Sequence, residues 1–206
     1  MIKYNKNFIS FEGPEASGKS SQIKLLSSFL LKKKIPHVIT REPGGTTNGE
    51  LLRKIILDKN EPITATEEIL LLMAARLNHI NKIIIPALKV GKIVISDRFA
   101  DSTFVYQGYV NKYGLNKTIE LHKKLLNNFL PSKTFLFLLK TKDIILRLKE
   151  RKIFNKYDLL NTDFHEKVIK GYKKISKNNK RFFILKADDK IENIHKTIIQ
   201  NLNKIL

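Results

Sequence analysis

The 206-residue chain contains no cysteine, so it has neither disulfide bonds nor a thiolate nucleophile. No window of the sequence reads as long and apolar enough to span a bilayer. Residues 1–7 are polar and lead directly into an apolar segment, and no signal peptide is visible there. Internal repeats, low-complexity tracts and interdomain linkers are also missing. These absences predict a cytoplasmic protein, without a membrane partner, folded as one domain over residues 1–206.

Acidic residues are scarce, because 19 Asp and Glu face 39 Lys and Arg and leave a net charge of +20. Such an excess can indicate nucleic-acid binding. Here the lysines are spread along the whole chain, and no stacking or groove-reading motif accompanies them. We therefore expect no dedicated nucleic-acid binding, and a basic surface that attracts anionic nucleotides.

One octapeptide matches the phosphate-binding pattern G-x-x-x-x-G-K-[ST]. It reads Gly13, Pro14, Glu15, Ala16, Ser17, Gly18, Lys19, Ser20. Residues 8–12 before it are apolar and aromatic and predict a strand, and residues 21–31 after it carry apolar side chains at helical spacing. The order of strand, loop and helix is the one that phosphate binding requires, because the loop N–H groups then point at the ligand from a helix N-terminus.

Each distinctive position of this loop has a chemical reason. Gly13 and Gly18 let the backbone curl close to phosphate oxygens without a Cβ in the way. Lys19 supplies a cation for the β- and γ-phosphates, and Ser20 supplies a hydroxyl for Mg²⁺. The alternative is a glycine turn followed by an ordinary exposed lysine, and the correct flanking segments argue against it. Residues 13–20 are thus the predicted ATP-binding loop.

The rest of the chain alternates between strand and helix patterns. The expected strands are residues 8–12, 37–40, 92–96, 134–139 and 182–185. The expected helices after the second strand are residues 49–58, 66–85, 101–109, 115–129, 141–151, 162–178 and 191–206. The pattern of residues 66–85 is either ended or bent by Pro86. Alternation of this kind predicts an α/β fold, a five-stranded parallel sheet with helices on both faces.

Ligands of such a sheet collect at the carboxyl ends of the strands. The loop 41–46 and the turn 187–189 fall at two of these ends. Asp97 follows the third strand, where it is placed to hold Mg²⁺ through water. The alternative for Asp97 is a helix N-cap, and both roles are compatible. The sequence therefore predicts a metal site made of Ser20 and Asp97.

Several blocks of the chain, taken in order, resemble the bacterial thymidylate kinases. These blocks are residues 11–13, 40–46, 74–79, 96–99 and 101–108. The resemblance covers nearly the whole chain and implies a P-loop nucleoside monophosphate kinase fold with a short lid, usually in a homodimer. The implied reaction is ATP·Mg²⁺ + dTMP → ADP + dTDP, a step of dTTP biosynthesis, with Mg²⁺ as the cofactor.

The resemblance also implies roles for the residues that would bind dTMP. Arg41 and Arg98 would hold its phosphate, which suits a rigid, always charged guanidinium fork. The implied contacts with the base and sugar come from Glu15, Leu72, Arg76, Thr103, Tyr106 and Gln107. The less favoured alternative for Tyr106 is a core aromatic, because tyrosine often buries its ring structurally. His79 matches a family histidine, for which a structural role is expected.

Residues 147–161 would form the lid, with Arg151 as the catalytic cation and Arg147 over the adenine. Catalysis would then rest on Lys19, Arg98, Arg151 and Glu15. The chain departs from the family pattern at two positions. Leu72 stands where a phenylalanine usually stacks on thymine, and Lys156 stands where the lid usually carries an arginine. These departures put base affinity and the placement of lid charge in question.

Two other functions fit parts of the sequence. One is a kinase for a different nucleoside monophosphate. The other is a P-loop ATPase coupled to motion of nucleic acid or protein, which the basic charge favours. An ATPase switch more often has Asp-Glu after the third strand, where the glutamate activates water. Here Asp97 is followed by Arg98, which suits an anionic acceptor.

Overall fold

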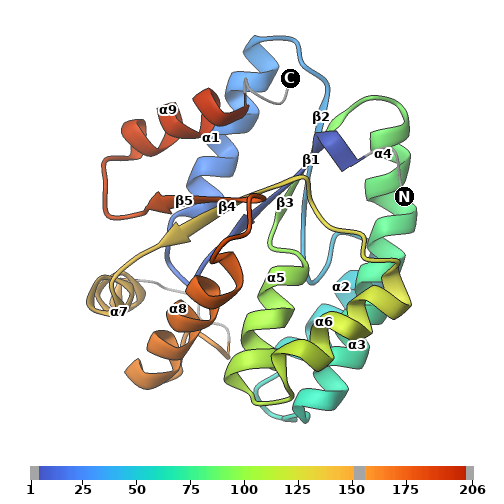
Figure 1. Ribbon diagram of the computed structural model, residues 1–206, viewed down its shortest axis with the longest axis vertical. Helices are drawn as coiled ribbons and strands as arrows, with labels where there is room; N and C mark the ends of the chain where they lie inside the picture. Colours follow the sequence, from blue (N-terminus) through green and yellow to red (C-terminus); the bar gives the residue numbers. More distant parts are fainter. Residues whose placement is uncertain (1–4, 151–155, 203–206) are drawn as a thin grey trace.

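The computed structural model describes residues 5–150 and 156–202. Its centre is a five-stranded parallel sheet with the strand order β2-β3-β1-β4-β5 (Figure 1). The strands are β1 (Phe8–Glu12), β2 (His37–Arg41), β3 (Ile93–Asp97), β4 (Lys133–Leu138) and β5 (Phe182–Lys186). The predicted fold class is thus confirmed.

Helices connect each strand to the next. The α-helices are α1 (Lys19–Lys32), α2 (Thr47–Leu57), α3 (Ala65–His79), α4 (Ile85–Lys89), α5 (Ala100–Thr103), α6 (Leu115–Leu126), α7 (Thr141–Lys149), α8 (Thr162–Ser176) and α9 (Ile191–Leu202). A 3₁₀ turn, η1 (Asn5–Asn7), and two π-helical segments, η2 (Ile80–Ile84) and η3 (Phe104–Val110), complete the described elements.

Alternating side chains of the strands build a core on each face of the sheet. Ile9 and Ile95 point into the layer formed by α1, α7 and α9, whereas Phe8 and Val94 point into the layer formed by α3, α4 and α6. Figure 1 shows α1 and α9 side by side on one side of the sheet, and α3, α5 and α6 on the other. Both faces are covered, which is why the strands are apolar throughout.

The two π-helical segments differ from the continuous helices that the apolar spacing predicts. The expected helix 66–85 runs on through η2 into α4, with Pro86 in the first turn of α4. Proline has no N–H to donate and crowds the preceding turn, and a π segment just before it accommodates both effects. The expected helix 101–109 is likewise divided into α5 and η3. Pro86 therefore bends the pattern rather than ending it.

The expectation that no segment is long and apolar enough to cross a membrane was wrong, because one helical stretch among the described residues meets both criteria, length and composition. Within the continuous helical stretch Ala65–Lys89, an 18-residue window has a mean hydropathy of 1.3. Its apolar side chains Ile69, Met73 and Ile84 lie in the core beneath the sheet. A buried core helix of a globular protein meets the same criterion, because it too is apolar over much of its circumference.

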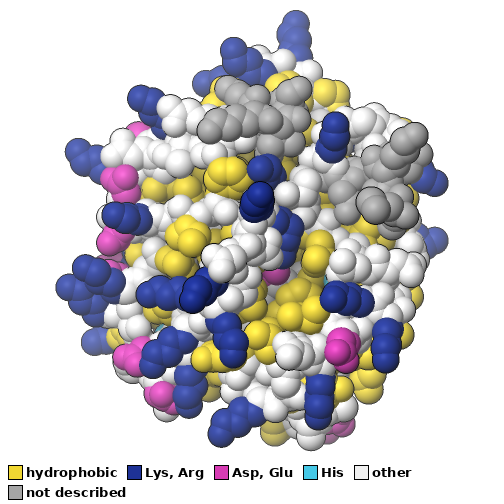
Figure 2. Space-filling view, viewed as in Figure 1, with side chains coloured by type: hydrophobic (Ala, Val, Ile, Leu, Met, Phe, Trp, Pro, Cys, Tyr) yellow, Lys and Arg dark blue, Asp and Glu magenta, His cyan; other side chains and the backbone are white. Residues whose placement is uncertain are grey.

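Basic and apolar side chains share the surface. On the face shown in Figure 2, Lys and Arg are dispersed among white and yellow patches and do not form a single stripe. Elsewhere, α2 and α3 pack against each other and expose four large apolar side chains. These are Leu51, Ile55, Leu70 and Leu77.

Candidate active site

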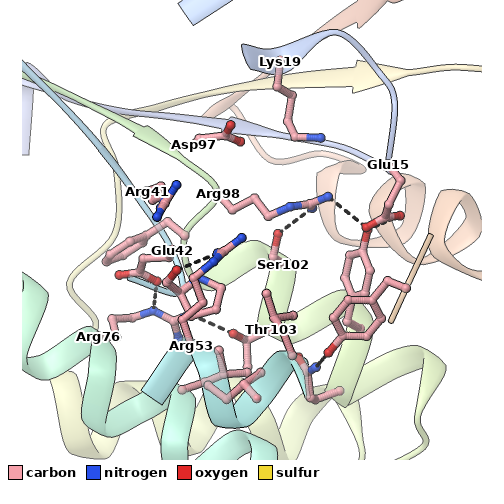
Figure 3. Close-up of a pocket in the computed structure, with 18 of the residues that line it drawn as sticks. Glu15, Lys19, Arg41, Glu42, Arg53, Arg76, Asp97, Arg98, Ser102 and Thr103 are labelled. Carbon is pink, nitrogen blue, oxygen red and sulfur yellow. Dashed lines mark hydrogen bonds and ion pairs between the residues drawn. The ribbon is translucent and has the colours of Figure 1, made fainter. Parts of the chain in front are cut away.

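A cavity of about 290 Å³ opens at the carboxyl ends of β1, β2 and β3 (Figure 3). The chain leaves β1 towards β2 on one side and leaves β4 towards β5 on the other, so a switch point lies between the neighbouring strands β1 and β4, and the cavity sits beside it at the end of β1. The residues predicted from the sequence that line it are Glu15, Ala16, Lys19, Ser20, Arg41, Leu72, Arg76, Asp97, Arg98, Thr103, Tyr106 and Gln107. Residues from distant parts of the chain thus meet in one place.

The predicted phosphate-binding loop joins β1 to α1, and its glycines are required by the backbone. Gly13 has a φ of 141°, and a Cβ there would collide with the carbonyl of Phe137. Gly18 caps the start of α1 with a φ of 88°, in the left-handed region that favours glycine. The curled loop therefore depends on these two positions.

Lys19 is held inside the loop. Its Nζ donates to the carbonyls of Gly13 (3.1 Å) and Pro14 (2.8 Å) and to Ser17 Oγ (3.1 Å). The side chain is only 7 % exposed. Burial lowers the pKa of Lys19 to about 8, so the amine is mostly protonated at neutral pH. A cation is thus fixed beside the loop N–H groups.

Two oxygen atoms that suit a metal ion as ligands, from Ser20 and Asp97, meet at the edge of the loop. Ser20 Oγ donates a hydrogen bond to Asp97 Oδ2 at 3.0 Å. Hydroxyl and carboxylate oxygens suit Mg²⁺, so this pair fits the predicted metal site. Among the described residues, no three His, Cys, Asp or Glu side chains form a cluster that could hold a metal ion. The pair would therefore need phosphate oxygens and water to complete the coordination of Mg²⁺.

Arg98 occupies the centre of the cavity in a strained conformation. Its φ is 68°, which is uncommon for a residue with a Cβ and costs on the order of 1 kcal/mol. Nη1 donates to the carbonyl of Gly13 (2.9 Å), Ser102 Oγ (3.1 Å) and Tyr172 Oη (3.2 Å), and Nη2 donates to Glu15 Oε1 (3.0 Å). These contacts direct the guanidinium at the loop (Figure 3).

Two further arginines face the same space. Arg41, at the end of β2, is exposed and pairs with Glu50 on α2 at 2.9 Å. Arg53, one turn further along α2, donates to the carbonyl of Pro43 at 2.7 Å and lines the cavity. Burial and the charge of Arg41 lower the pKa of Arg53. The sequence prediction missed Arg53, because no motif distinguishes it from other cations of a surface helix.

Glu12 was also missed, although it belongs to a block that carries the resemblance. Its side chain is fully buried and accepts hydrogen bonds from the Phe99 N–H (2.7 Å), Ser102 Oγ (2.7 Å) and Tyr172 Oη (2.9 Å). Burial, with the nearby Asp101, raises the pKa of Glu12 to about 7. Ser102 and Tyr172 thereby link this carboxyl to Arg98.

This shift predicts a pH-dependent stability. The pKa of Glu12 in the folded state lies above the ordinary value of 4.5. The protonated group therefore contributes stability below about pH 4.5 that is lost as the pH rises through about 7. Relative to a Glu12→Gln variant, the protein should lose on the order of 3 kcal/mol over this window. Urea unfolding of both proteins across the window measures it, and parallel stability curves would contradict it.

The far end of the cavity carries a buried ion network. Arg76 on α3 is 1 % exposed and donates from Nε to Glu42 Oε2 (2.7 Å) and from Nη2 to Thr103 Oγ1 (2.8 Å). His79 lies between Glu42 Oε1 (2.9 Å) and Thr40 Oγ1 (2.6 Å). Although burial opposes its charge, Arg76 and His79 hold the pKa of Glu42 below its ordinary value. His79 does not line the cavity, which agrees with the expected structural role.

Tyr106 belongs both to the core and to the wall of the cavity. Its ring packs in the core with Phe164 and Tyr172, and it also lines the cavity. Its hydroxyl donates to Glu15 Oε1 (2.7 Å) and Oε2 (2.8 Å), beside the guanidinium of Arg98. The tyrosine therefore anchors the acidic residue of the phosphate-binding loop.

The residues predicted to form a lid lie in two places. Arg147 on α7 lies outside the cavity and donates to the carbonyls of Ala16 (3.3 Å) and Ala187 (3.0 Å). It thereby joins the phosphate-binding loop to the predicted turn 187–189. Lys156 forms an ion pair with Glu68 on α3, and Tyr157 lines the cavity. Arg151 lies outside the described residues.

A second buried pair supports the helix that carries Ser102 and Thr103. Arg181, beside β5, binds Asp101 on α5 through Nη1 and Nη2, each at 2.7 Å. Removing one member of a buried ion pair leaves the other charge without compensation. We expect Arg181→Met to lower the free energy of unfolding by about 3 kcal/mol. Denaturant unfolding tests this against Lys180→Met, an exposed neighbour, and equal small changes would refute it.

The comparisons with known proteins agree with this geometry. The profile of the thymidylate kinase family matches residues 11–198. The chain is 40% identical over 200 residues to a thymidylate kinase of Rickettsia bellii, with 96% of each chain covered. It is 42% identical over 203 residues to that of Orientia tsutsugamushi, which covers 95% of this chain and 92% of the relative. A crystal structure of thymidylate kinase from Ehrlichia chaffeensis superposes with a TM-score of 0.77 at 32% identity, covering 97% of this chain and 99% of the other. The chain therefore belongs to the thymidylate kinase family of phosphotransferases.

Proposed function

We propose that the chain transfers the γ-phosphoryl group of ATP to dTMP, giving ADP and dTDP. The observation that carries this proposal is the layout of one cavity. The phosphate-binding loop with Lys19 lies at one end, Arg41, Arg53 and Arg98 lie in the middle, and Arg76 lies at the far end (Figure 3). This spatial order of cationic groups along the cavity suits, in turn, the triphosphate of a donor, the phosphate of an acceptor and the base of that acceptor.

On the donor side, residues 13–20 would bind the phosphates of ATP. Ser20 and Asp97 would hold Mg²⁺, which when bound neutralises charge on the β- and γ-phosphates. Arg147 bridges the loop and the carbonyl of Ala187, so it would border the adenine. Lys19 would turn from the loop carbonyls to the phosphate oxygens, which are stronger acceptors.

On the acceptor side, Arg41 and Arg98 would hold the phosphate of dTMP, and Arg53 would assist. Arg98 reaches the carbonyl of Gly13, so its fork can span both the acceptor and the transferred group. Glu15, held by Tyr106, would lie near the sugar and the acceptor phosphate. The base would lie among Leu72, Arg76, Thr103 and Gln107, which all line the cavity.

The remaining expectations rest on the resemblance. Residues 1–206 would act as one domain, with a lid near 147–161 and Arg151 as its catalytic cation. The exposed apolar side chains on α2 and α3 provide a surface on which a homodimer could form. Light scattering of the purified protein measures that state. Location in the cytoplasm and the absence of dedicated nucleic-acid binding are proposed on the same basis.

Acceptor-dependent product formation tests the proposed reaction. ADP release from ATP·Mg²⁺ should require a nucleoside monophosphate, and the mass of the product should identify dTDP when dTMP is supplied. A panel of other nucleoside monophosphates separates this activity from a kinase of different specificity. ADP release that is equally fast without an acceptor would indicate an ATPase and overturn the proposal.

Leu72 predicts a modest choice between dTMP and dUMP. The two differ by one methyl group, which an apolar pocket discriminates by roughly 10–200-fold. Leu72 lines the cavity where the family usually stacks a phenylalanine on the base. We expect Leu72→Phe to tighten dTMP binding by about 0.5–1.5 kcal/mol, the value of an aromatic contact. Calorimetric titration of both proteins measures it, and weaker or equal binding would show that residue 72 does not stack on the base.

A further inference from the structure

The side chain of Gln107 is buried between two groups on the wall of the cavity. Its Nε2 donates to Glu68 Oε2 on α3 at 2.8 Å and to Tyr157 Oη at 3.0 Å. Tyr157 Oη in turn lies 3.3 Å from Glu68 Oε2, and it can donate to that carboxylate. Gln107 is 2 % exposed and Glu68 is 3 % exposed, so water does not compete for these bonds.

Glu68 fixes which way the amide of Gln107 faces. An ionised carboxylate accepts hydrogen bonds and cannot donate them. The other carboxylate oxygen of Glu68 is paired with the ammonium group of Lys156. Turning the amide by 180° would place its oxygen against the carboxylate oxygen, which is repulsive, and the single hydroxyl hydrogen of Tyr157 would serve only one of these two buried acceptors. The NH₂ group therefore faces Glu68, and none of the described residues donates to Gln107 Oε1.

The opposite polarity, a hydrogen-bond donor, is fixed on the same helix α3, a little more than two turns after Glu68. Arg76 is held by Glu42 and Thr103 and presents only N–H donors (Figure 3). Arg76 and Gln107 both line the cavity. The wall thus offers an acceptor, Gln107 Oε1, and a donor, Arg76, to the same ligand.

We propose that Glu68 is a positioning residue that sets base specificity by orienting the amide of Gln107. This inference rests on the proposed function. An acceptor together with a donor complements the N3–H and O4 of thymine and uracil. Cytosine presents an unprotonated N3 and an N4 amino group, so the same wall would meet it acceptor to acceptor and donor to donor. Glu68 would exclude cytosine without touching the base.

The test is the ratio of the dissociation constants for dCMP and dTMP, measured by calorimetry. Binding is measured because it reports on base specificity even if the protein does not phosphorylate dTMP. A failure of the proposed kinase activity is therefore distinguishable from a failure of the proposed role of Glu68. In Glu68→Gln the new side chain can donate as well as accept, which allows the amide of Gln107 to turn. We expect the ratio to fall at least about tenfold in this variant. Glu68→Asp keeps a carboxylate and should retain most of the preference for dTMP.

Two further variants separate orientation from a merely structural role. Lys156→Met removes the ion pair but keeps the carboxylate that holds Gln107, so the ratio should stay near that of the parent. Gln107→Leu should lose the preference in the same way as Glu68→Gln, and it serves if Glu68→Gln does not fold. An unchanged ratio in folded Glu68→Gln, or a preserved preference for dTMP in Gln107→Leu, would overturn the inference.

Discussion

Replacing Lys19 with alanine is expected to lower kcat by about 1000-fold or more. The ammonium group lies within 3.1 Å of the carbonyls of Gly13 and Pro14, at the centre of the curled loop. Phosphoryl transfer involves little covalent chemistry for the protein, so catalysis rests on positioning and on stabilising charge. Removing a single preorganised donor from a site of developing charge typically costs 100- to 1000-fold. A fixed, buried cation should be worth at least the upper part of that range.

The matched control is Lys24→Ala. Lys24 lies on the same helix, α1, but is exposed, and it should leave kcat within a factor of about two. Circular dichroism and thermal unfolding establish that both variants are folded, so that a loss of turnover reports on chemistry. If the Lys19→Ala enzyme stayed within about tenfold of the parent, the loop would not be the phosphate site.

The elements that the sequence predicted well are those specified by local chemistry. The strand, loop and helix around Lys19 follow from neighbouring residues, because glycine conformations and apolar spacing act over a few positions. The parallel sheet follows from the same alternation along the chain. Pro86 shows the limit of local information, because a proline in a helical pattern predicts either a break or a bend. The helix continues through the π segment η2 into α4, and this continuation follows from the surrounding structure.

The parts of the site that escaped prediction are assembled by long-range contacts. Glu12 and Tyr172 meet across 160 positions of sequence, and nothing near either residue indicates the other. Glu68 and Gln107 meet across 39 positions in the same way. Arg53 is one of many cations on helix surfaces, and only the fold turns it toward the cavity. The motifs thus identified groups that would touch a ligand, whereas the groups that orient them required the structure.

Replacing Arg98 with lysine is expected to lower kcat/KM for dTMP by about 100-fold or more, although the charge is retained. The guanidinium makes four hydrogen bonds, to Gly13, Ser102, Tyr172 and Glu15. A lysine ammonium is a single compact group without the planar fork, so it cannot reach all four partners at once. The strained backbone at φ 68° is the same for both residues, since each has a Cβ. The substitution therefore isolates the planar fork from charge and backbone.

Arg41→Lys makes the same substitution at a second arginine of the cavity. Comparing the two variants shows whether the loss at Arg98 comes from its fork geometry or from replacing any arginine of the cavity with lysine. Arg41 is more than half exposed and already paired with Glu50, and a lysine there can still deliver its charge, so a loss below about tenfold is expected. For Arg98 the loss should fall mainly on kcat, because a group that reaches the loop carbonyl of Gly13 acts on the transferring phosphoryl rather than on dTMP alone. A rise in KM with unchanged kcat would make Arg98 a binding residue only. Parent-like kinetics for Arg98→Lys would show that its bonds to Ser102, Tyr172 and Glu15 serve the fold and not the reaction.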